Sequence, residues 1–272
     1  MKSTPLRGLF FTSIPKAGKN LIYSFLNELG YGRPAIPREG AVWSAERPML
    51  AASGRRCTYA LPPPAEDAAT IDGQASRFAD QVATLGDRQV VHHHVPFSAG
   101  LASRLAAAGV PVVFVYRDPR DVLLSMADYI LNQGSPAHLA GRFAGRSRAE
   151  LVQVLWAGDD LLVPLAAYID AFDGWRTDPR TVSVRFEDLI GERGGGTAEI
   201  QSAALRRIAG QLGAVTPAAL ARAQAKTFNP KAGTFFKGQA GRWREETEPA
   251  VRAVLHANQM MELATRWGYP AK

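Results

Sequence analysis

The chain has 272 residues, of which 46% are hydrophobic and 21% are charged, and this composition excludes a wholly disordered or collagen-like chain. Lys and Arg number 32 against 25 Asp and Glu, so the formal net charge of +7 fits either an ordinary solvated surface or a groove for an anion. Cys57 is the only cysteine, which excludes an intramolecular disulfide framework and a four-cysteine zinc site.

Strands alternate with helices along the first half of the chain. An apolar run with Phe, Thr and Ile predicts a short buried strand over residues 6–14. Residues 15–18 break this strand, and apolar side chains at helical spacing then predict a helix over residues 20–29 that Gly30 ends. The next expected elements are a strand over 89–95, a helix over 99–108 and a nearly all-apolar strand over 110–116.

The second half continues the same alternation. Asp118 suits the N-cap of a helix over residues 119–131, with Pro119 in its first turn and Asp121 at the third position of a capping box. The elements expected after it are helices within 148–173, a strand over 181–186, helices over 198–212 and 217–226, and one closing helix over 245–267. This order predicts a single α/β domain over residues 1–272, with a parallel, doubly wound sheet and helices on both faces.

Two further features concern the chain outside these elements. Residues 31–64 are rich in Pro, Gly and Arg without a clear period, which predicts either a substrate-binding lid or a poorly ordered segment. No stretch approaches the roughly 20 apolar residues of a membrane helix, and the apolar run of residues 9–11 is too short for a signal peptide. We therefore expect a cytoplasmic protein.

The segment SIPKAGKN, residues 13–20, joins the first strand to the first helix. Gly18 allows close backbone approach, and Lys16 and Lys19 add positive charge at a helix start, which together favour phosphate binding. A triphosphate loop would end in Ser or Thr, whose hydroxyl holds magnesium, but this segment ends in Asn20. The segment is thus suited to a phosphate without magnesium, or it is simply a lysine-bearing turn into a helix.

The segment YRDPRDVLLS, residues 116–125, follows a buried strand at the position where open α/β sheets bind ligands. Arg117 and the hydroxyl of Ser125 could hold one phosphate together. Alternatively, Arg117 pairs with Asp118 or Asp121, and Ser125 only contacts the backbone.

The segment VHHHVP, residues 91–96, places three histidines in or beside a strand. His92 and His94 should share one face of the strand and His93 the other. The pair could bind a metal, although the sequence shows no third ligand nearby, or one histidine could act as a general base near neutral pH. Buried structural histidines are the third interpretation.

Five segments resemble, in the same order, the motifs of the cytosolic-type sulfotransferases of the P-loop-like superfamily. IPKAGKNL resembles the phosphosulfate loop Y-P-K-S-G-T-T-W, and HHHVP resembles K-T-H-L-P. RDPRDVLLS resembles the 3′-phosphate motif, with Arg117 and Ser125 at the family's spacing of eight. VRFEDL resembles R-Y-E-D-L, and FFKGQAGRW resembles the F-R-K-G-x-x-G-D-W loop that closes over the cofactor.

The resemblance implies transfer of a sulfonate from 3′-phosphoadenosine 5′-phosphosulfate (PAPS) to a hydroxyl, less often an amine, of a small-molecule acceptor. It implies His94 as the general base and Lys16 as the group that stabilises the leaving phosphate of the product, 3′-phosphoadenosine 5′-phosphate (PAP). It implies no metal and no nucleic-acid partner. The cofactor-binding residues implied are Lys16, Ala17, Gly18, Lys19, Asn20, Leu21, Arg117, Ser125, Phe186, Phe228, Lys237 and Gly238.

Several positions depart from the family pattern. Leu21 replaces the Trp that stacks on adenine, Phe186 replaces a Tyr, and Phe236 replaces an Arg that contacts the 3′-phosphate. Arg242 replaces the Asp of G-D-W, and His92 stands where the family has a Lys near the transferring sulfonate. The resemblance therefore implies cofactor binding but not the family's typical affinity.

The resemblance also locates the acceptor site in two variable loops, residues 31–81 and 132–148. Four aromatic side chains there would either line an apolar pocket for an aromatic or lipophilic alcohol or pack in the core: Trp43, Tyr59, Phe78 and Phe143. The sequence leaves the oligomeric state open. The alternatives to a sulfotransferase are a P-loop small-molecule or nucleotide kinase and a non-catalytic basic module that binds anions.

Overall fold

The computed structural model of the chain describes residues 6–32, 79–80, 82–132, 143–159, 162–230 and 238–270. These residues form two compact units. The first holds the described residues up to Tyr116 and those of Phe172–Ala240, and the second holds those of Arg117–Ala171 and those from Gly241 onward. The single domain expected over residues 1–272 stays a prediction.

A four-stranded sheet of parallel strands, in the order β2-β1-β3-β4, forms the centre of the first unit. Its strands are β1 (Leu9–Ser13), β2 (Val90–His93), β3 (Val112–Tyr116) and β4 (Thr181–Arg185). Every residue of β1 is buried, and all but the last of β3, as expected for parallel strands covered on both faces. In the register, Phe11 is paired with His92 and Ser13 with Val115.

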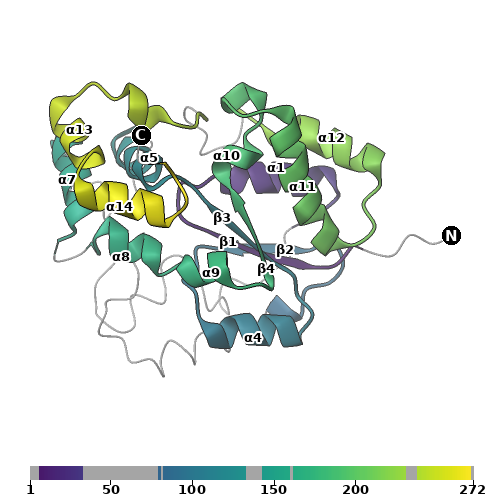
Figure 1. The fold of residues 1–272 in the computed structure, drawn as a ribbon. Coiled ribbons are helices and arrows are strands. Elements are labelled where there is room, and N and C mark those ends of the chain that lie inside the picture. The colour runs from purple at the N-terminus through teal and green to yellow at the C-terminus, as the bar shows by residue number, and fades with distance from the viewer. Residues whose placement is uncertain are drawn as a thin grey trace. The chain divides into compact units, whose positions relative to one another are not determined.

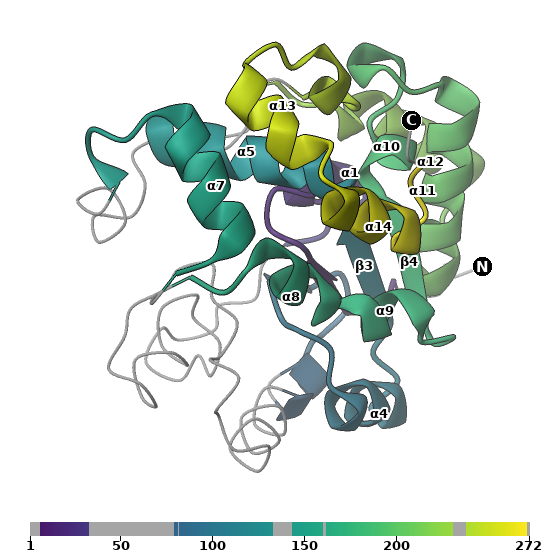
Figure 2. The same ribbon diagram turned by 60° about the vertical axis from the view of Figure 1, so that its left-hand side comes forward.

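Helices cover both faces of this sheet. Those of the first unit are α1 (Lys19–Glu28), α4 (Ala99–Ala107), α9 (Asp173–Thr177), α10 (Phe186–Leu189), η2 (Glu192–Gly194), α11 (Ala198–Leu212) and α12 (Pro217–Thr227). Figure 1 shows α1, α11 and α12 on one side of the sheet and α4 and α9 on the other, and the turned view of Figure 2 keeps this separation. The predicted doubly wound α/β architecture is therefore confirmed.

The strand order reverses beside β1, because the chain goes outward from β1 to β2 and then returns to β3 on the other side. In open α/β sheets, ligands bind outside the carboxyl ends of the strands at such a switch point. The carboxyl end of β1 continues into the loop of residues 14–18. The predicted phosphate loop thus begins at the edge where this fold places its ligands.

The second unit consists of helices. These are α5 (Pro119–Asn132), α7 (Arg148–Ala157), α8 (Leu165–Asp170), η3 (Arg242–Glu245), α13 (Pro249–Leu255) and α14 (Asn258–Arg266). α5 packs against α7, α14 and η3, and α7 also packs against α8 and α13. α7 begins at a capping box, in which Ser147 accepts from the Glu150 amide and Glu150 accepts from the Ser147 amide.

The single closing helix expected over residues 245–267 is wrong, because α13 and α14 are separate. The backbone of Ala257 is extended, with ψ of 142°, and ends the helical run. The buried residues Leu255 and Met260 are five positions apart, whereas a continuous helix would turn the exposed Asn258 and Gln259 toward the core. The break restores the apolar face of the second helix.

Most of the expected acceptor loops, including Trp43, Tyr59 and Phe78, lies outside the described residues. Phe143 is described and is buried, as in the alternative that it packs in a core. In the described part of the chain, no helix has both the length and the apolar character needed to span a bilayer. The cytoplasmic location stays a prediction.

Candidate active site

The loop after β1 turns tightly into α1. Lys16 has a φ of 66° and Gly18 a φ of 95°, both in the left-handed region, and the Ala17 amide donates to the Ile14 carbonyl oxygen at 3.1 Å. Gly18 is the N-cap of α1, where glycine adopts this conformation without steric cost. Residues with a Cβ atom, such as Lys16, rarely adopt this conformation. Non-glycine residues that do adopt it concentrate at functional sites.

The Phe186 ring packs against Gly18 of this loop. A Cβ atom added to Gly18 would lie 2.5 Å from Cδ2 of Phe186 and 3.3 Å from Cδ1 of Leu21, so only glycine allows this approach. Phe186 and Leu21 are both buried. The structure therefore gives both residues a role in shaping the loop, and their contact with a nucleotide stays a prediction.

The N-terminus of α1 is electrically positive. No side chain caps it, and its first turn contains no acidic residue. The partial positive charge of the helix dipole and the ammonium groups of Lys16 and Lys19 favour an anion here. Asn20, the second residue of α1, has an amide in place of the hydroxyl that would hold magnesium.

Two histidines converge on the last residue of β1. The Ser13 hydroxyl lies 3.0 Å from Nε2 of His92 and 3.2 Å from Nδ1 of His94. The Ser13 carbonyl oxygen lies 2.7 Å from Nδ1 of His94. The two rings are perpendicular, with their centroids 4.6 Å apart. The prediction that His92 and His94 share a face is confirmed, although His94 lies one residue beyond the end of β2.

The backbone beside His94 is held on two sides. The Thr12 hydroxyl donates to the Val95 carbonyl oxygen and accepts from the Val95 amide, both at 3.1 Å. The indole Nε1 of Trp175 also donates to the Val95 carbonyl oxygen, at 2.9 Å. Thr12 and Trp175 are fully buried. These contacts fix the position from which the His94 ring projects.

His93 and His94 have unusually low pKa values. Burial lowers the pKa of His93 to about 4. Burial also lowers the pKa of His94 to about 4, opposed by its hydrogen bond to Ser13 and reinforced by the charges of Lys19, His93 and Lys16. His94 is therefore neutral at neutral pH and lies within electrostatic reach of both loop lysines. The structure thus brings together three of the residues predicted for the site.

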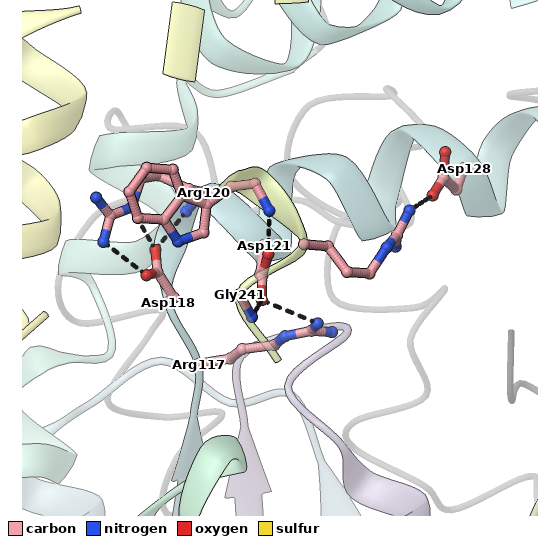
Figure 3. A network of polar contacts seen from close by, with 8 residues as sticks. Arg117, Asp118, Arg120, Asp121, Asp128 and Gly241 are labelled. Carbon is pink, nitrogen blue, oxygen red and sulfur yellow. Dashed lines mark hydrogen bonds and ion pairs between the residues drawn. The ribbon is translucent and has the colours of Figure 1, made fainter. Parts of the chain in front are cut away.

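In the second unit, the Asp121 carboxylate links Arg117 to residues 241–243 (Figure 3). Its Oδ2 accepts from Nη2 of Arg117 at 3.2 Å and from the Gly241 amide at 2.7 Å, while Oδ1 accepts from the Trp243 amide at 3.0 Å. Arg117 and Asp121 are both buried. The interpretation that Arg117 pairs with Asp121 is confirmed, and Asp121 has this role in place of the capping-box role expected for it.

Asp118 and Arg120 form a second buried ion pair at the start of α5. Oδ1 of Asp118 accepts from the Arg120 amide at 3.0 Å, which confirms Asp118 as a cap. The Arg120 guanidinium bonds both carboxylate oxygens, at 2.9 and 2.7 Å, and donates to the Pro270 carbonyl oxygen at 2.8 Å. It also stacks on Trp243, 3.6 Å from the ring centroid. Arg120 thus organises the interior of this unit.

Arg242 occupies the position of an aspartate in the sulfotransferase motif G-D-W, and it forms an ion pair with a residue of α5. Its Nη2 donates to Oδ2 of Asp128 at 2.6 Å, and Nε of Arg148 donates to Oδ1 of the same carboxylate at 3.1 Å. Ser125 lies one turn before Asp128 and is half-buried. The binding of a 3′-phosphate by Arg117 and Ser125 stays a prediction.

Two further predicted cofactor residues, Phe228 and Gly238, lie near the end of the first unit. Phe228 follows α12 directly and has the guanidinium of Arg193 5.9 Å from its ring centroid. Gly238 has a φ of 58° and lies close to Gly194, whose added Cβ atom would be 2.8 Å from the Gly238 carbonyl oxygen. Lys237 lies outside the described residues.

Sequence reasoning missed Thr12, Ser13 and Trp175 as residues that support the site. It included the pairing of Asp121 with Arg117 but not the bonds from Asp121 to the amides of residues 241–243. The available signal was the polar pair Thr12–Ser13 at the end of an otherwise apolar strand. Within the described ranges, no group of three or more His, Cys, Asp or Glu side chains could hold a metal ion.

Comparison with solved structures defines the fold. A mouse sulfotransferase, SULT7A1, complexed with PAP superposes with a TM-score of 0.58 at 14% sequence identity, over 98% of this chain and 86% of the mouse chain. The chain has the sulfotransferase fold. Retinol dehydratase with androsterone and the inactive cofactor PAP gives a TM-score of 0.53 at 14% identity, over 97% of this chain and 80% of the other. Its complex with retinol and PAP gives 0.52 at 15%, over 97% and 81%. No protein-family model matches the sequence, and no curated protein is significantly similar to it.

Proposed function

We propose that this protein is a PAPS-dependent sulfotransferase that acts on a small-molecule alcohol. The observation that carries the proposal is the placement of neutral His94 within electrostatic reach of Lys16 and Lys19, at the carboxyl edge of the sheet. A base beside an anion-binding loop is what sulfonate transfer to a hydroxyl requires. The sulfotransferase fold supports this function over other uses of a phosphate loop.

The residues of the first unit suit the 5′ end of the nucleotide. The uncapped N-terminus of α1, free of acidic residues in its first turn, and the ammonium groups of Lys16 and Lys19 would hold the 5′-phosphosulfate, with the backbone of residues 17–21 around it. Phe186, Phe228, Lys237 and Gly238 are the proposed further contacts. When bound, PAPS supplies the activated sulfonate and a phosphate leaving group.

The residues of the second unit suit the 3′-phosphate. Arg117 is buried and oriented by Asp121, and Ser125 is half-buried on the following helix. A guanidinium held in one orientation binds phosphate at a lower entropic cost than a mobile one. We propose that Arg117 and Ser125 bind this phosphate.

His94 would take the proton of the acceptor hydroxyl, and Lys16 would stabilise the negative charge on the leaving phosphate. Neutralisation of the lysine charges by a bound phosphate removes one cause of the low pKa of His94 and favours proton uptake. The alcohols bound in the retinol dehydratase complexes, androsterone and retinol, are both lipophilic and support a lipophilic alcohol as the acceptor class. Retention of turnover in His94→Ala would contradict the role of this base.

Thermal unfolding with different nucleotides tests the proposal. We expect PAP to stabilise the protein by about 2.7 kcal/mol at a hundredfold excess over its dissociation constant, and 5′-AMP much less at the same concentration.

Arg117→Ala should weaken PAP binding by roughly 1.5–3 kcal/mol, because a charged hydrogen bond is lost. Arg180→Ala is the matched control, since Arg180 also pairs with an aspartate, Asp178, but is exposed and lies before β4, outside the segments proposed to bind the nucleotide.

The other outcomes separate the alternatives. Equal stabilisation by PAP and 5′-AMP would contradict the 3′-phosphate site. Stronger stabilisation by ATP with magnesium would favour a kinase. Binding to a sulfated polymer that falls steeply with salt, without any effect of PAP, would favour a non-catalytic basic module.

A further inference from the structure

Ser13 presents both of its oxygen atoms to one nitrogen of His94. The carbonyl oxygen lies 2.7 Å and the hydroxyl oxygen 3.2 Å from Nδ1. A carbonyl oxygen can only accept a hydrogen bond, so the short contact requires Nδ1 to carry the proton. In the neutral ring, Nε2 is then the nitrogen with the free lone pair.

The Ser13 hydroxyl also connects His94 to His92. With Nδ1–H of His94 acting as a donor, the hydroxyl proton is available for Nε2 of His92, 3.0 Å away. The His92 ring is itself packed against Phe11, with their centroids 4.3 Å apart, and Tyr23 lies edge-on to both rings. Ser13 is fully buried at the end of a central strand. Ser13 is thus a well-fixed residue to which the His94 ring is hydrogen-bonded.

We propose that Ser13 is the positioning residue for His94, holding its Nδ1–H so that Nε2 takes the proton of the acceptor hydroxyl. This inference rests on the proposed function and goes beyond it, because it assigns the reacting atom and a residue that the site prediction omitted. The hydrogen bond to Ser13 raises the pKa of His94 against the effect of burial, which is the direction that a base needs.

The step balances without another reactant. The acceptor O–H bond breaks, and its proton moves to the lone pair of Nε2 while the acceptor oxygen bonds to sulfur. The bond between sulfur and the bridging oxygen breaks, and its electron pair stays with the 5′-phosphate of PAP. His94 becomes an imidazolium ion whose Nδ1–H still donates to Ser13, and it later releases the Nε2 proton to solvent.

Nitrogen NMR of the full-length protein labelled with ¹⁵N-histidine tests the tautomer without any need for turnover. We expect the His94 signals, assigned by their loss in His94→Gln, to show a protonated Nδ1 and an unprotonated Nε2 at pH 7, with or without PAP. A protonated Nε2 with a bare Nδ1 would overturn the proposal. Because this measurement does not depend on catalysis, its outcome stands apart from that of the proposed function.

Kinetics test whether the positioning matters. With PAPS as donor and 2-naphthol as the probe acceptor, Ser13→Ala should lower kcat about tenfold, with little change in KM for PAPS or in PAP affinity. Ser13→Thr keeps the hydroxyl and should restore most of kcat. Ser183→Ala is the matched control, because it removes a strand hydroxyl that bonds only backbone oxygens.

The two measurements also separate the possible failures. A wild-type protein that binds PAP but consumes no PAPS would contradict the proposed function, and the NMR result would still decide the role of Ser13. Ser13→Ala removes the hydroxyl and keeps the backbone carbonyl that holds Nδ1–H. An unchanged kcat in this variant, beside an active wild type, would overturn the role of the hydroxyl, and the NMR result alone would decide the role of the carbonyl.

Discussion

At the scale of single residues, Lys16 combines a charged side chain with a backbone conformation that suits glycine. Its φ of 66° costs an L-residue about 1–2 kcal/mol relative to an ordinary conformation. Glycine would relieve this strain but would lose the ammonium group that the proposed reaction uses. The position thus sets stability against function.

We predict that Lys16→Gly is more stable than Lys16→Ala by about 0.5–1 kcal/mol, because alanine keeps the left-handed strain and glycine removes it. Urea unfolding of both variants measures this difference. Both should lose PAPS turnover, since neither carries the charge. Equal stability of the two variants would show that the backbone at Lys16 is not strained.

Site residues that act together with their sequence neighbours were predictable. Site residues that act through contacts with distant parts of the chain were not. The residues of the Lys16–Gly18 turn are adjacent in the sequence, so its glycine and the nearby lysines predict it. Ser13 and Thr12 act on partners about 80 positions away, at His94 and Val95, and no local pattern reports such a pairing. Asp121 illustrates the same limit, because its position suits a cap while its carboxylate bonds amides about 120 residues away.

At the scale of elements, Asp121 joins the start of α5 to the start of η3. Three donors share its two oxygens: one guanidinium and the amides of Gly241 and Trp243. An asparagine would keep one accepting oxygen and replace the other with an NH₂ group that faces donors. At least one buried donor would then lose its partner.

We predict that Asp121→Asn lowers the free energy of unfolding by about 1–3 kcal/mol, the usual cost of an unsatisfied buried donor. Asp173→Asn is the matched control, because Asp173 also pairs with an arginine but is partly exposed. Its expected loss is below about 1 kcal/mol. Denaturant unfolding followed by tryptophan fluorescence compares the two. Similar losses in both variants would show that Asp121 does not anchor residues 241–243.

The elements themselves were largely predictable, because each carries its own periodicity and caps. α11 has the predicted bounds, with Thr197 as its cap, and α5 differs from its prediction by one residue at its end. The error at α13 and α14 came from reading residues 245–267 as one continuous helix. The five-residue spacing from Leu255 to Met260 was the available signal, because a continuous helix buries residues three or four positions apart. The sequence alone did not show that both of these residues are buried.

At the scale of the whole molecule, two half-buried histidines make folding sensitive to acid. The pKa of His93 and that of His94 are each about 4 in the folded protein, against 6.5 in the unfolded chain. Well above pH 6.5 both states are neutral at these positions, and neither histidine affects the pH dependence of stability. Below pH 6.5 the unfolded chain binds protons first, so the free energy of unfolding falls until the folded protein also titrates near pH 4.

We predict that the free energy of unfolding falls between pH 6.5 and pH 4 by an amount that His94→Gln reduces. One pKa unit corresponds to about 1.4 kcal/mol, so each histidine should account for roughly 1–2 kcal/mol of the loss between pH 6.5 and pH 5. Urea unfolding at half-unit pH steps measures the slope for the wild type and the variant. His256→Gln, at an exposed histidine, is the control for the substitution itself. If His94→Gln and wild type lost stability equally on acidification, His94 would not be held neutral by the fold, and its assignment as a neutral base would be wrong.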